Sequence, residues 1–319
     1  MYSKGVSVII CCYNSEWIIK RCLKALIDQK FTSKITWEII IVNNSSTDNT
    51  ISIANDTLQK TSLDFSIIDE KTPGLLSARK CGVRHAKYSY IIFCDDDNLL
   101  CNNYVESMYF AMEENQQIGA YGGRGIAEFE LTPEDIVKSN LYSYATGSQK
   151  ENVANNGLYG AGVCVRTDII TKIYKEHNFL LTGRCGEKLL AGDDSEMIKA
   201  IILAGYKIDY NDNIAFIHVL TSRRLTFKYL CNMVAGFGLS SPVLYTYDLC
   251  INKQSFNKIY PYYIISLLKL TIYFFFTFIP SIRIKYNYLL NRIKGVHFWK
   301  ISKLKTLYQI LIKLQPSNE

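Results

Sequence analysis

The residues best suited to chemistry are three consecutive aspartates, Asp95, Asp96 and Asp97, at the end of the apolar run YIIFC. In an extended chain alternate side chains share a face, so Asp95 and Asp97 can approach one hard cation while Asp96 points away. Carboxylate oxygens suit Mn2+ or Mg2+, and either ion can bridge two phosphates. The alternative is a solvated acidic turn that caps the next helix. The spacing alone leaves both interpretations open.

A second acidic group lies in AGDDSEM, where Asp193 and Asp194 precede a helix expected over about 195–204. A carboxylate at this place could accept the proton of a hydroxyl nucleophile. Asp193 and Glu196 also have the spacing of a capping box, which would make the pair structural.

His218 lies near the end of the apolar segment IAFIHVL and is followed by Arg223 and Arg224. A histidine on an apolar strand is often a hydrogen-bonded core residue, although it can also bind a metal. The arginines could form forked hydrogen bonds to phosphate or could be surface charges.

Three short apolar segments, 6–10, 38–42 and 90–93, have the composition of buried parallel strands, and each ends in a polar cluster. Helix-like stretches follow the first two, over 17–29 and 50–59. The alternation predicts an α/β fold with a Rossmann-type, mostly parallel sheet flanked by helices. Ligands collect at the carboxyl ends of such strands, so the three polar clusters predict one site.

After Asp97 the pattern becomes less regular. We expect a helix over 104–114, a tight turn at YGGRG (121–125), a turn-rich segment over 159–163 and a strand over 214–220. There is no GxGxxG after the first strand and no GxxxxGK[ST], which argues against a dehydrogenase or a P-loop enzyme.

The ten cysteines show no CxxC or zinc-type spacing, which favours a reducing cytosol, and the first residues show no export signal. The net charge of +7 is uneven, because residues 249–319 carry nine lysines and two arginines against the single Glu319. No nucleic-acid-binding motif accompanies these charges, so we expect no nucleic acid and instead an anionic membrane surface as partner.

The composition shift predicts a main domain over 1–240, which holds all the candidate site residues above, and a basic, aromatic-rich helical tail over 241–319. Residues 259–280 are numerous enough to span a bilayer, but Lys269 in their middle argues for a peripheral position on the inner face of the cell membrane. The alternative is that the tail completes the protein's own core or forms a dimer contact.

From Val6 to about Leu230 the chain resembles the family 2 glycosyltransferases, which have the GT-A fold. The first strand with Tyr13, Asn14 and Glu16 looks like the family's opening motif, although Cys11 and Cys12 stand where proline and a small residue are usual. IIVNNSSTDNT and GLLSARKCGVRHAKYSYIIFCDDDN are similar to the segments that follow, the latter ending in the DxD signature.

The resemblance implies roles for single residues. Tyr13, Asn14 and Glu16 would edge the nucleotide pocket, Arg79 would meet the base or phosphates, Asp95 would approach the ribose, and Asp97 would ligate the metal with Asp95 and His218.

Asn43 and Asn44 stand where the family often has an aspartate that accepts a proton from the base. An asparagine can both accept and donate, so the base preference stays open. Ordinary capping of the following helix is the structural alternative for this turn.

By the same resemblance Asp194 would be the catalytic base, with Asp193 orienting it or the acceptor, and Arg223 and Arg224 would contact the diphosphate. The processive members carry QxxRW where this chain has TSRRLTFKYL, which favours transfer of a single sugar.

The implied activity is metal-dependent, inverting transfer of one sugar from a nucleotide-diphosphate-sugar to a hydroxyl of a glycan or lipid-linked glycan, in bacterial surface polysaccharide or glycoconjugate assembly. One alternative is a sugar-phosphate nucleotidyltransferase, although CCYNSE lacks the glycine-rich, lysine-containing loop expected there. The other is a catalytically inactive carbohydrate-binding scaffold.

Overall fold

The computed structural model describes residues 2–177, 179–184 and 191–314. Its contacts divide the chain into two compact units. Unit 1 comprises Met1–Glu128, Tyr144–Asn178 and Tyr206–Leu220, and unit 2 comprises Phe129–Ser143, Phe179–Gly205 and Thr221–Glu319.

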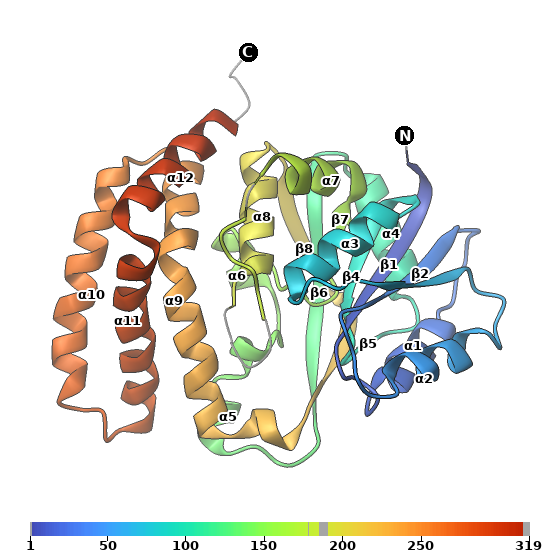
Figure 1. Cartoon of the computed structure of the whole chain (residues 1–319), viewed down its shortest axis with the longest axis horizontal. Helices are drawn as coiled ribbons and strands as arrows, with labels where there is room; N and C mark the ends of the chain where they lie inside the picture. Colours follow the sequence, from blue (N-terminus) through green and yellow to red (C-terminus); the bar gives the residue numbers. More distant parts are fainter. Residues whose placement is uncertain (1, 178, 185–190, 315–319) are drawn as a thin grey trace. The chain divides into compact units, whose positions relative to one another are not determined.

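Unit 1 is built on an eight-stranded sheet with the order β3-β2-β1-β4-β7-β6-β8-β5 and helices beside it (Figure 1). Its strands are β1 (Ser3–Cys12), β2 (Trp37–Asn43), β3 (Phe65–Asp69), β4 (Tyr88–Asp95), β5 (Asn98–Leu100), β6 (Ile118–Phe129), β7 (Cys164–Arg166) and β8 (Lys207–Leu220). Its helices are α1 (Ile19–Ile27), α2 (Thr50–Leu58), α3 (Leu75–His85), α4 (Tyr104–Glu114), α6 (Lys150–Ala154) and α7 (Thr167–Glu176).

Strands β3, β2, β1 and β4 run parallel, whereas β4–β7, β6–β7 and β5–β8 are antiparallel. In β1, Val6, Val8 and Ile10 belong to the core cluster that also holds Leu23 of α1 and Met108 of α4. The intervening side chains are buried too, as expected for a strand with both faces covered. The predicted α/β class, with a mostly parallel sheet and flanking helices, is confirmed.

Two details of unit 1 differ from the sequence prediction. Strand β3 was not predicted, because its side chains are half-buried or exposed and carry no strong apolar pattern. YGGRG was predicted as a tight turn but lies inside β6. A glycine within a strand often marks a close approach by another group. At Gly123 the group is the Tyr104 hydroxyl, which a Cβ would meet and which donates to Gly162 O at 2.8 Å.

The side chain of Arg166, at the end of β7, ties three elements of unit 1 together. Arg166 is 8% exposed. Its Nε donates to Ile118 O at 2.7 Å, and its Nη2 donates to Met112 O at 2.8 Å and Asn115 O at 3.1 Å. The guanidinium carbon also lies 5.4 Å from the centre of the Tyr90 ring. One side chain therefore satisfies carbonyls at the end of α4 and the start of β6.

We predict that Arg166→Met destabilises the protein by roughly 3 kcal/mol, because each buried carbonyl left without a donor costs about 1–3 kcal/mol. The urea midpoint should fall with an unchanged m-value. Lys172→Met, at an exposed position of α7, is the matched control and should unfold like the wild type. Equal midpoints for both variants would show that Arg166 does not hold these elements together.

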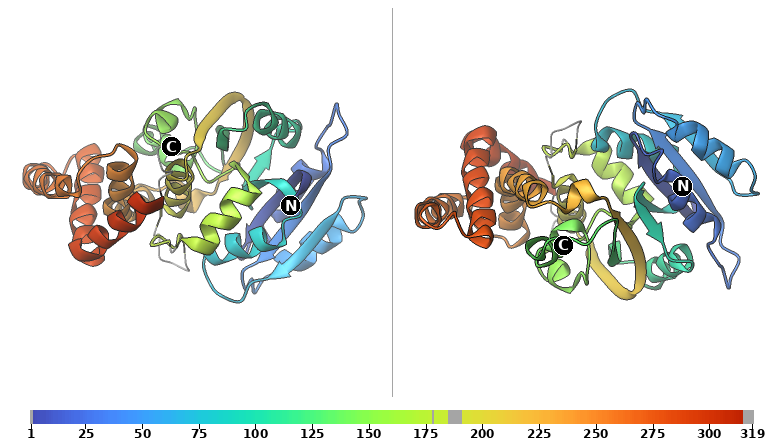
Figure 2. Two further views of the ribbon diagram at one scale, coloured as in Figure 1. Left: turned by 90° about the horizontal axis from the view of Figure 1, so that it is seen from above. Right: turned by 90° about the horizontal axis from the view of Figure 1, so that it is seen from below.

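Unit 2 is helical, and Figure 2 shows its long C-terminal helices from two further sides. Its helices are α5 (Asp135–Lys138), η1 (Leu141–Tyr144, ending at the unit boundary), α8 (Asp193–Leu203), η2 (Ser222–Leu225), α9 (Phe227–Ile251), η3 (Phe256–Lys258), α10 (Ile259–Phe274), α11 (Pro280–Trp299) and α12 (Ile301–Leu314). The predicted domain boundary after residue 240 falls inside α9.

Helices α9 and α11 approach closely because glycines lie at their contact. A Cβ on Gly238 would meet the backbone of Tyr288, and one on Gly295 would meet Leu239 O. Trp299 Nε1 donates to the same Leu239 O at 3.0 Å.

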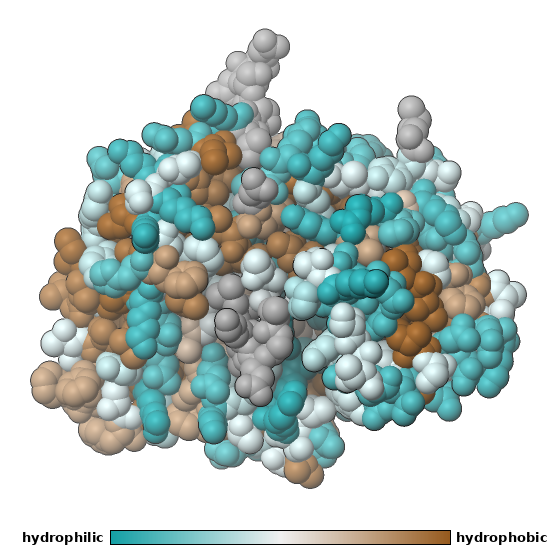
Figure 3. Space-filling model, viewed as in Figure 1, coloured by the Kyte–Doolittle hydropathy of each residue, from teal (hydrophilic) through white to brown (hydrophobic). Residues whose placement is uncertain are grey.

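Residues 259–280, predicted as one segment of spanning length, are interrupted in the structure. Helix α10 ends at Phe274, and α11 begins at Pro280 after a turn. Among the helices of the described residues, none is long and apolar enough to cross a membrane. Figure 3, viewed as Figure 1, shows apolar side chains on the surface at the edge where α10 lies.

Candidate active site

The carboxyl ends of β1, β2 and β4 lie next to one another in unit 1. Cys12 is the register partner of Asn43, and Cys11 is the partner of Asp95. The loops that follow these strands therefore start from one edge of the sheet, as the three polar clusters in the sequence predicted.

Hydrogen bonds join the loop after β1 to the loop after β2. Asn14 Oδ1 accepts from Thr47 N at 2.8 Å, and Glu16 Oε2 accepts from Asn49 N at 2.9 Å. Asn14 has a positive φ of 53°, which asparagine tolerates better than most residues. Tyr13 is 56% exposed. Asn14 and Glu16 thus hold the loop in place, and Tyr13 is accessible to a ligand.

Asn43 and Asn44 have different roles in the turn after β2. Asn44 is 8% exposed, donates to Glu70 O and Thr72 O at 2.9 and 2.8 Å, and accepts from Gly74 N at 2.8 Å. Its amide is occupied by the loop between β3 and α3.

Asn43 lies closer to solvent than Asn44. Its Nδ2 donates to Asp69 Oδ1 at 2.8 Å, and its Oδ1 accepts from Ser46 N at 2.9 Å. Asp69 ends the unpredicted strand β3 and was missed for that reason. It supplies an exposed carboxylate beside the position where the family often has an aspartate.

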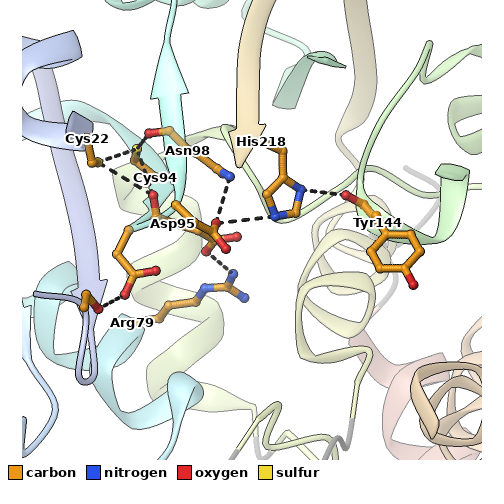
Figure 4. Close-up of polar contacts among 10 residues, drawn as sticks. Cys22, Arg79, Cys94, Asp95, Asn98, Tyr144 and His218 are labelled. Carbon is orange, nitrogen blue, oxygen red and sulfur yellow. Dashed lines mark hydrogen bonds and ion pairs between the residues drawn. The ribbon is translucent and has the colours of Figure 1, made fainter. Parts of the chain in front are cut away.

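Arg79 of α3 is 4% exposed and lies against the end of β4 (Figure 4). Its Nη2 is 3.7 Å from Asp95 Oδ1, and its guanidinium carbon is 5.5 Å from the centre of the Phe93 ring. The Asp95 side chain is 36% exposed, so the pair offers one accessible carboxylate held by a buried cation. Arg79 and Asp95, predicted for the same pocket, are brought together.

Asp97 and His218 face each other between the end of β4 and the end of β8. His218 Nε2 is 3.4 Å from Asp97 Oδ1, and His218 Nδ1 is 2.6 Å from Tyr144 O (Figure 4). The His218 side chain is 5% exposed and the Asp97 side chain 13% exposed. A carbonyl oxygen can only accept, so Nδ1 must carry a proton.

This hydrogen bond determines what Nε2 presents to Asp97. In the neutral imidazole Nε2 then carries a lone pair and no proton. Nε2 and Asp97 Oδ1 would both be acceptors, and two acceptors repel at this distance. A proton on Nε2 or a cation bound by both groups would relieve the repulsion. A ring nitrogen held by a carbonyl is also the usual support of a metal-binding histidine. The pair therefore fits a divalent cation.

The arrangement supplies few protein ligands. No group of three or more His, Cys, Asp or Glu side chains suited to a metal occurs within 2–177, 179–184 and 191–314. We expected Asp95 and Asp97 to share one face of an extended strand. However, β4 ends at Asp95, and Asp96 and Asp97 form a turn. Mg2+ is commonly held by one or two carboxylates together with substrate phosphates, so a sparse protein site suits a nucleotide-bound ion.

Sequence reasoning missed Asn98, the residue after the aspartates. Asn98 is fully buried and is the register partner of His218 across β5 and β8. Its Nδ2 donates to Asp97 Oδ1 at 3.1 Å, the same oxygen that faces His218. Asp96 instead accepts a hydrogen bond from the Ser15 hydroxyl. The fourth letter of DDDN could have indicated a residue that orients Asp97.

Two buried thiols lie beside this site. Cys22 Sγ and Cys94 Sγ are 3.9 Å apart (Figure 4). The hydrogen bond with Cys22 and the burial raise the pKa of Cys94 well above its usual value. Cys94 therefore stays a neutral thiol and is a poor metal ligand at neutral pH.

The second acidic motif lies in unit 2, at the start of α8. Gly192, in the left-handed conformation, is the N-cap, and Asp193 is already the first helical residue. The capping-box alternative therefore does not apply, because Asp193 is not the N-cap. Asp193 is 6% exposed, whereas Asp194 is partly exposed and accepts from Ser195 N at 2.7 Å. Asp194 is the more accessible of the two carboxylates.

Glu196 has a structural role that the sequence did not indicate. It is fully buried, accepts from Leu181 N at 2.7 Å and from the Tyr247 hydroxyl at 2.8 Å, and also accepts from Leu180 N. Glu196 thereby links Leu180, Leu181 and helix α9 to α8.

Arg223 and Arg224 lie on η2 of unit 2. Arg223 is exposed, whereas Arg224 is 8% exposed. Ser222 N, next to them, donates to Glu130 Oε2 at 2.6 Å. Of the two, Arg223 has the accessible guanidinium.

A family model described as glycosyl transferase family 2 matches residues 7–173, just over half of the chain. The chain therefore belongs to this family. The match includes the loops after β1 and β2, Arg79, and the three aspartates.

Two bacterial relatives share part of the chain. The poly(ribitol-phosphate) beta-glucosyltransferase of Bacillus spizizenii is 31% identical over an alignment of 160 positions, which covers 46% of this chain and 24% of the relative. The poly-beta-1,6-N-acetyl-D-glucosamine synthase of Staphylococcus epidermidis is 30% identical over 121 residues, which are 38% of this chain and 28% of the relative. The chain thus matches about a quarter of the length of each.

Among solved structures, a mannosyltransferase from Pyrobaculum calidifontis, in complex with GDP-Man and Mn2+, is similar with a TM-score of 0.61. The identity is 14%, and the match covers 94% of this chain and 89% of that one. The likeness confirms the predicted GT-A fold.

We predict that Asp97→Asn removes most of the Mn2+-dependent part of UDP or GDP binding, because the substitution takes away an anionic ligand from a hard cation. Calorimetric titrations with Mn2+ and with EDTA measure it. Asp168→Asn, an exposed aspartate on α7, is the control. An Asp97 variant with unchanged metal dependence would refute the assignment.

Proposed function

We propose that this glycosyltransferase transfers a single sugar, with inversion, from a nucleotide-diphosphate-sugar to an acceptor hydroxyl, using Mn2+ or Mg2+. The observation that carries the proposal is the pairing of Asp97 Oδ1 with His218 Nε2 at 3.4 Å while Nδ1 is committed to Tyr144 O. Family membership supports glycosyl transfer over the nucleotidyltransferase alternative.

Asp97 and His218 would hold the ion, and Asn98 would keep the shared Asp97 oxygen in position. A bound divalent cation stabilises negative charge on the leaving diphosphate. The exposed Arg223 would add positive charge for phosphate, and the buried Arg79 would hold Asp95 in position. In this scheme Asp95 accepts hydrogen bonds from the ribose hydroxyls.

The nucleotide would lie over the loops after β1 and β2. Tyr13 is exposed and can cover the base, while Asn14 and Glu16 hold the loop beneath it. Asn44 is committed to backbone groups, so we assign base recognition to Asn43 and its partner Asp69. An amide and a carboxylate together can accept from the N–H of uracil or guanine.

Asp194 would act as the general base, because it is more exposed than Asp193 and a sugar hydroxyl must lose its proton as it attacks. Asp193 would orient this motif. A single displacement by the acceptor hydroxyl inverts the anomeric carbon.

The acceptor class follows from the relatives by analogy. Their names refer to poly(ribitol-phosphate) and to poly-beta-1,6-N-acetyl-D-glucosamine. We therefore assign this chain to the assembly of a bacterial surface polysaccharide or glycoconjugate, with a glycan or lipid-linked glycan as acceptor and a cytoplasmic location near the inner face of the membrane.

The test is a panel of UDP- and GDP-sugars, each assayed for thermal stabilisation and for hydrolysis, with Mn2+ or with EDTA. A donor that binds the folded state raises the apparent Tm. We expect stabilisation by one nucleotide class, dependent on the metal, and slow hydrolysis of its sugar. Stabilisation that survives EDTA unchanged would overturn the role of the metal.

We predict that Asp194→Asn retains donor affinity and lowers transfer by about a hundredfold to ten-thousandfold, the usual contribution of a positioned general base. Rates of donor consumption in the presence of acceptor, together with the Kd of the donor, measure both effects.

Asp168→Asn, an exposed aspartate on α7, is the control and should leave transfer within a few-fold of the wild type. A joint collapse of donor affinity and transfer in Asp194→Asn would make this aspartate structural. In that case Asp193 becomes the candidate base.

A further inference from the structure

The surface of α10 and of the turn after it is unusually apolar for an exposed helix. The most exposed side chains are Phe278 at 78%, Phe275 at 68% and Leu268 at 62%. Other apolar side chains of this segment with more than a third of their surface exposed are Tyr260, Ile264, Ile265, Leu267, Ile272, Phe274, Phe276 and Ile279. We call this set the α10 patch. A contiguous exposed apolar patch marks an interaction surface.

The patch is distinct from the side by which α10 packs on its own unit. Ser266 is fully buried, and Tyr262 stacks on Tyr245 with ring centres 4.0 Å apart. Tyr260, Ile264, Leu268 and Ile272 follow one another at intervals of four residues, so they share the opposite side of the helix. A helix that is apolar on all sides is normally buried or in contact with lipid.

The charges around the patch have one sign. Between residues 249 and 314 there are eleven lysines and arginines and no aspartate or glutamate. Lys269 on α10 and Lys285 in the second turn of α11 are both exposed. Two copies of this surface would bring like charges together, which opposes self-association through it. An anionic surface complements it.

Tyrosines complete the pattern. Tyr260, Tyr263, Tyr273 and Tyr286 lie on the same two helices, and tyrosine is enriched at the boundary between headgroups and acyl chains. The helix itself is short: α10 has 16 residues, or about 24 Å at 1.5 Å per residue, less than the roughly 30 Å of a hydrocarbon core. The geometry suits a helix that lies in the interface.

We propose that the α10 patch docks on the surface of an anionic lipid bilayer, with Phe275, Phe276 and Phe278 inserted at the headgroup boundary and the surrounding lysines and arginines against lipid phosphates. The inference does not rest on the proposed sugar transfer, because it concerns only the side chains of α10, the turn and α11.

The experiment is sedimentation of the full chain with sucrose-loaded vesicles, either phosphatidylcholine alone or phosphatidylcholine with 30% phosphatidylglycerol, at low and high salt. We expect binding to the anionic vesicles, at least tenfold weaker binding to the neutral ones, and a strong loss of binding at high salt.

The apolar part is tested with the double variant Phe275→Ser, Phe278→Ser, which should bind anionic vesicles at least tenfold more weakly than the wild type. Its control is Leu131→Ser, Tyr142→Ser, two side chains of the same unit that are 62% and 67% exposed. The control should bind like the wild type. Thermal melting of both variants verifies that they fold.

The charged part is tested with Lys269→Ser, Lys285→Ser, which should lower binding to anionic vesicles about tenfold and leave binding to neutral vesicles unchanged. Lys24→Ser, Lys60→Ser removes the same charge from unit 1 and should have a much smaller effect.

Two results would overturn the proposal. One is a folded phenylalanine variant that binds anionic vesicles like the wild type. The other is a wild-type chain that ignores vesicles and forms a dimer that the same variant abolishes, as measured by light scattering. The second result would assign the patch to another copy of the chain.

Discussion

The hydrogen bond between His218 Nδ1 and Tyr144 O is the contact on which the chemistry of the site depends. A backbone carbonyl cannot donate, so it fixes one proton on the ring and turns the other nitrogen toward Asp97. Asn98 restrains the same carboxylate from the neighbouring strand. Water has little access to the Asp97 carboxylate and the His218 ring, because both side chains are largely buried. Either a proton on Nε2 or the divalent cation that we propose would make the contact between the two groups attractive.

Polar side chains within the loops around this centre hold the loops themselves in shape. Asn14 and Glu16 use their side-chain oxygens to hold backbone amides of the loop after β2. Asn44 holds the loop between β3 and α3 in the same manner. Structural and binding roles are thus not alternatives here, because a polar loop must satisfy its own amides before it can present a fixed surface.

The sequence was informative where residues act through local patterns. Strands β1, β2 and β4, helix α4 and the strand-end site follow from buried apolar runs and polar ends. It failed where distant residues decide. In β6, Gly123 leaves room for the Tyr104 hydroxyl, which a Cβ would meet. Glu196 accepts hydrogen bonds from Leu181 N and the Tyr247 hydroxyl and does not cap its own helix. Likewise, the residues next to His218 in the sequence do not predict its hydrogen bond with Tyr144 O, 74 residues away.

The C-terminal helices illustrate the same division. Pro280 favours a helix break, because the residue before a proline is biased to an extended backbone, and Ile279 has φ −85° and ψ 120°. That bias is legible in one residue, although Pro242 lies inside α9 without ending it. Which side of α10 is covered is not, since it depends on Tyr245 stacking on Tyr262 and on Ser241, which accepts from the Tyr262 hydroxyl at 3.0 Å. With that side occupied, the apolar surface that α10 and the following turn still expose can be buried only against a second phase or a second molecule.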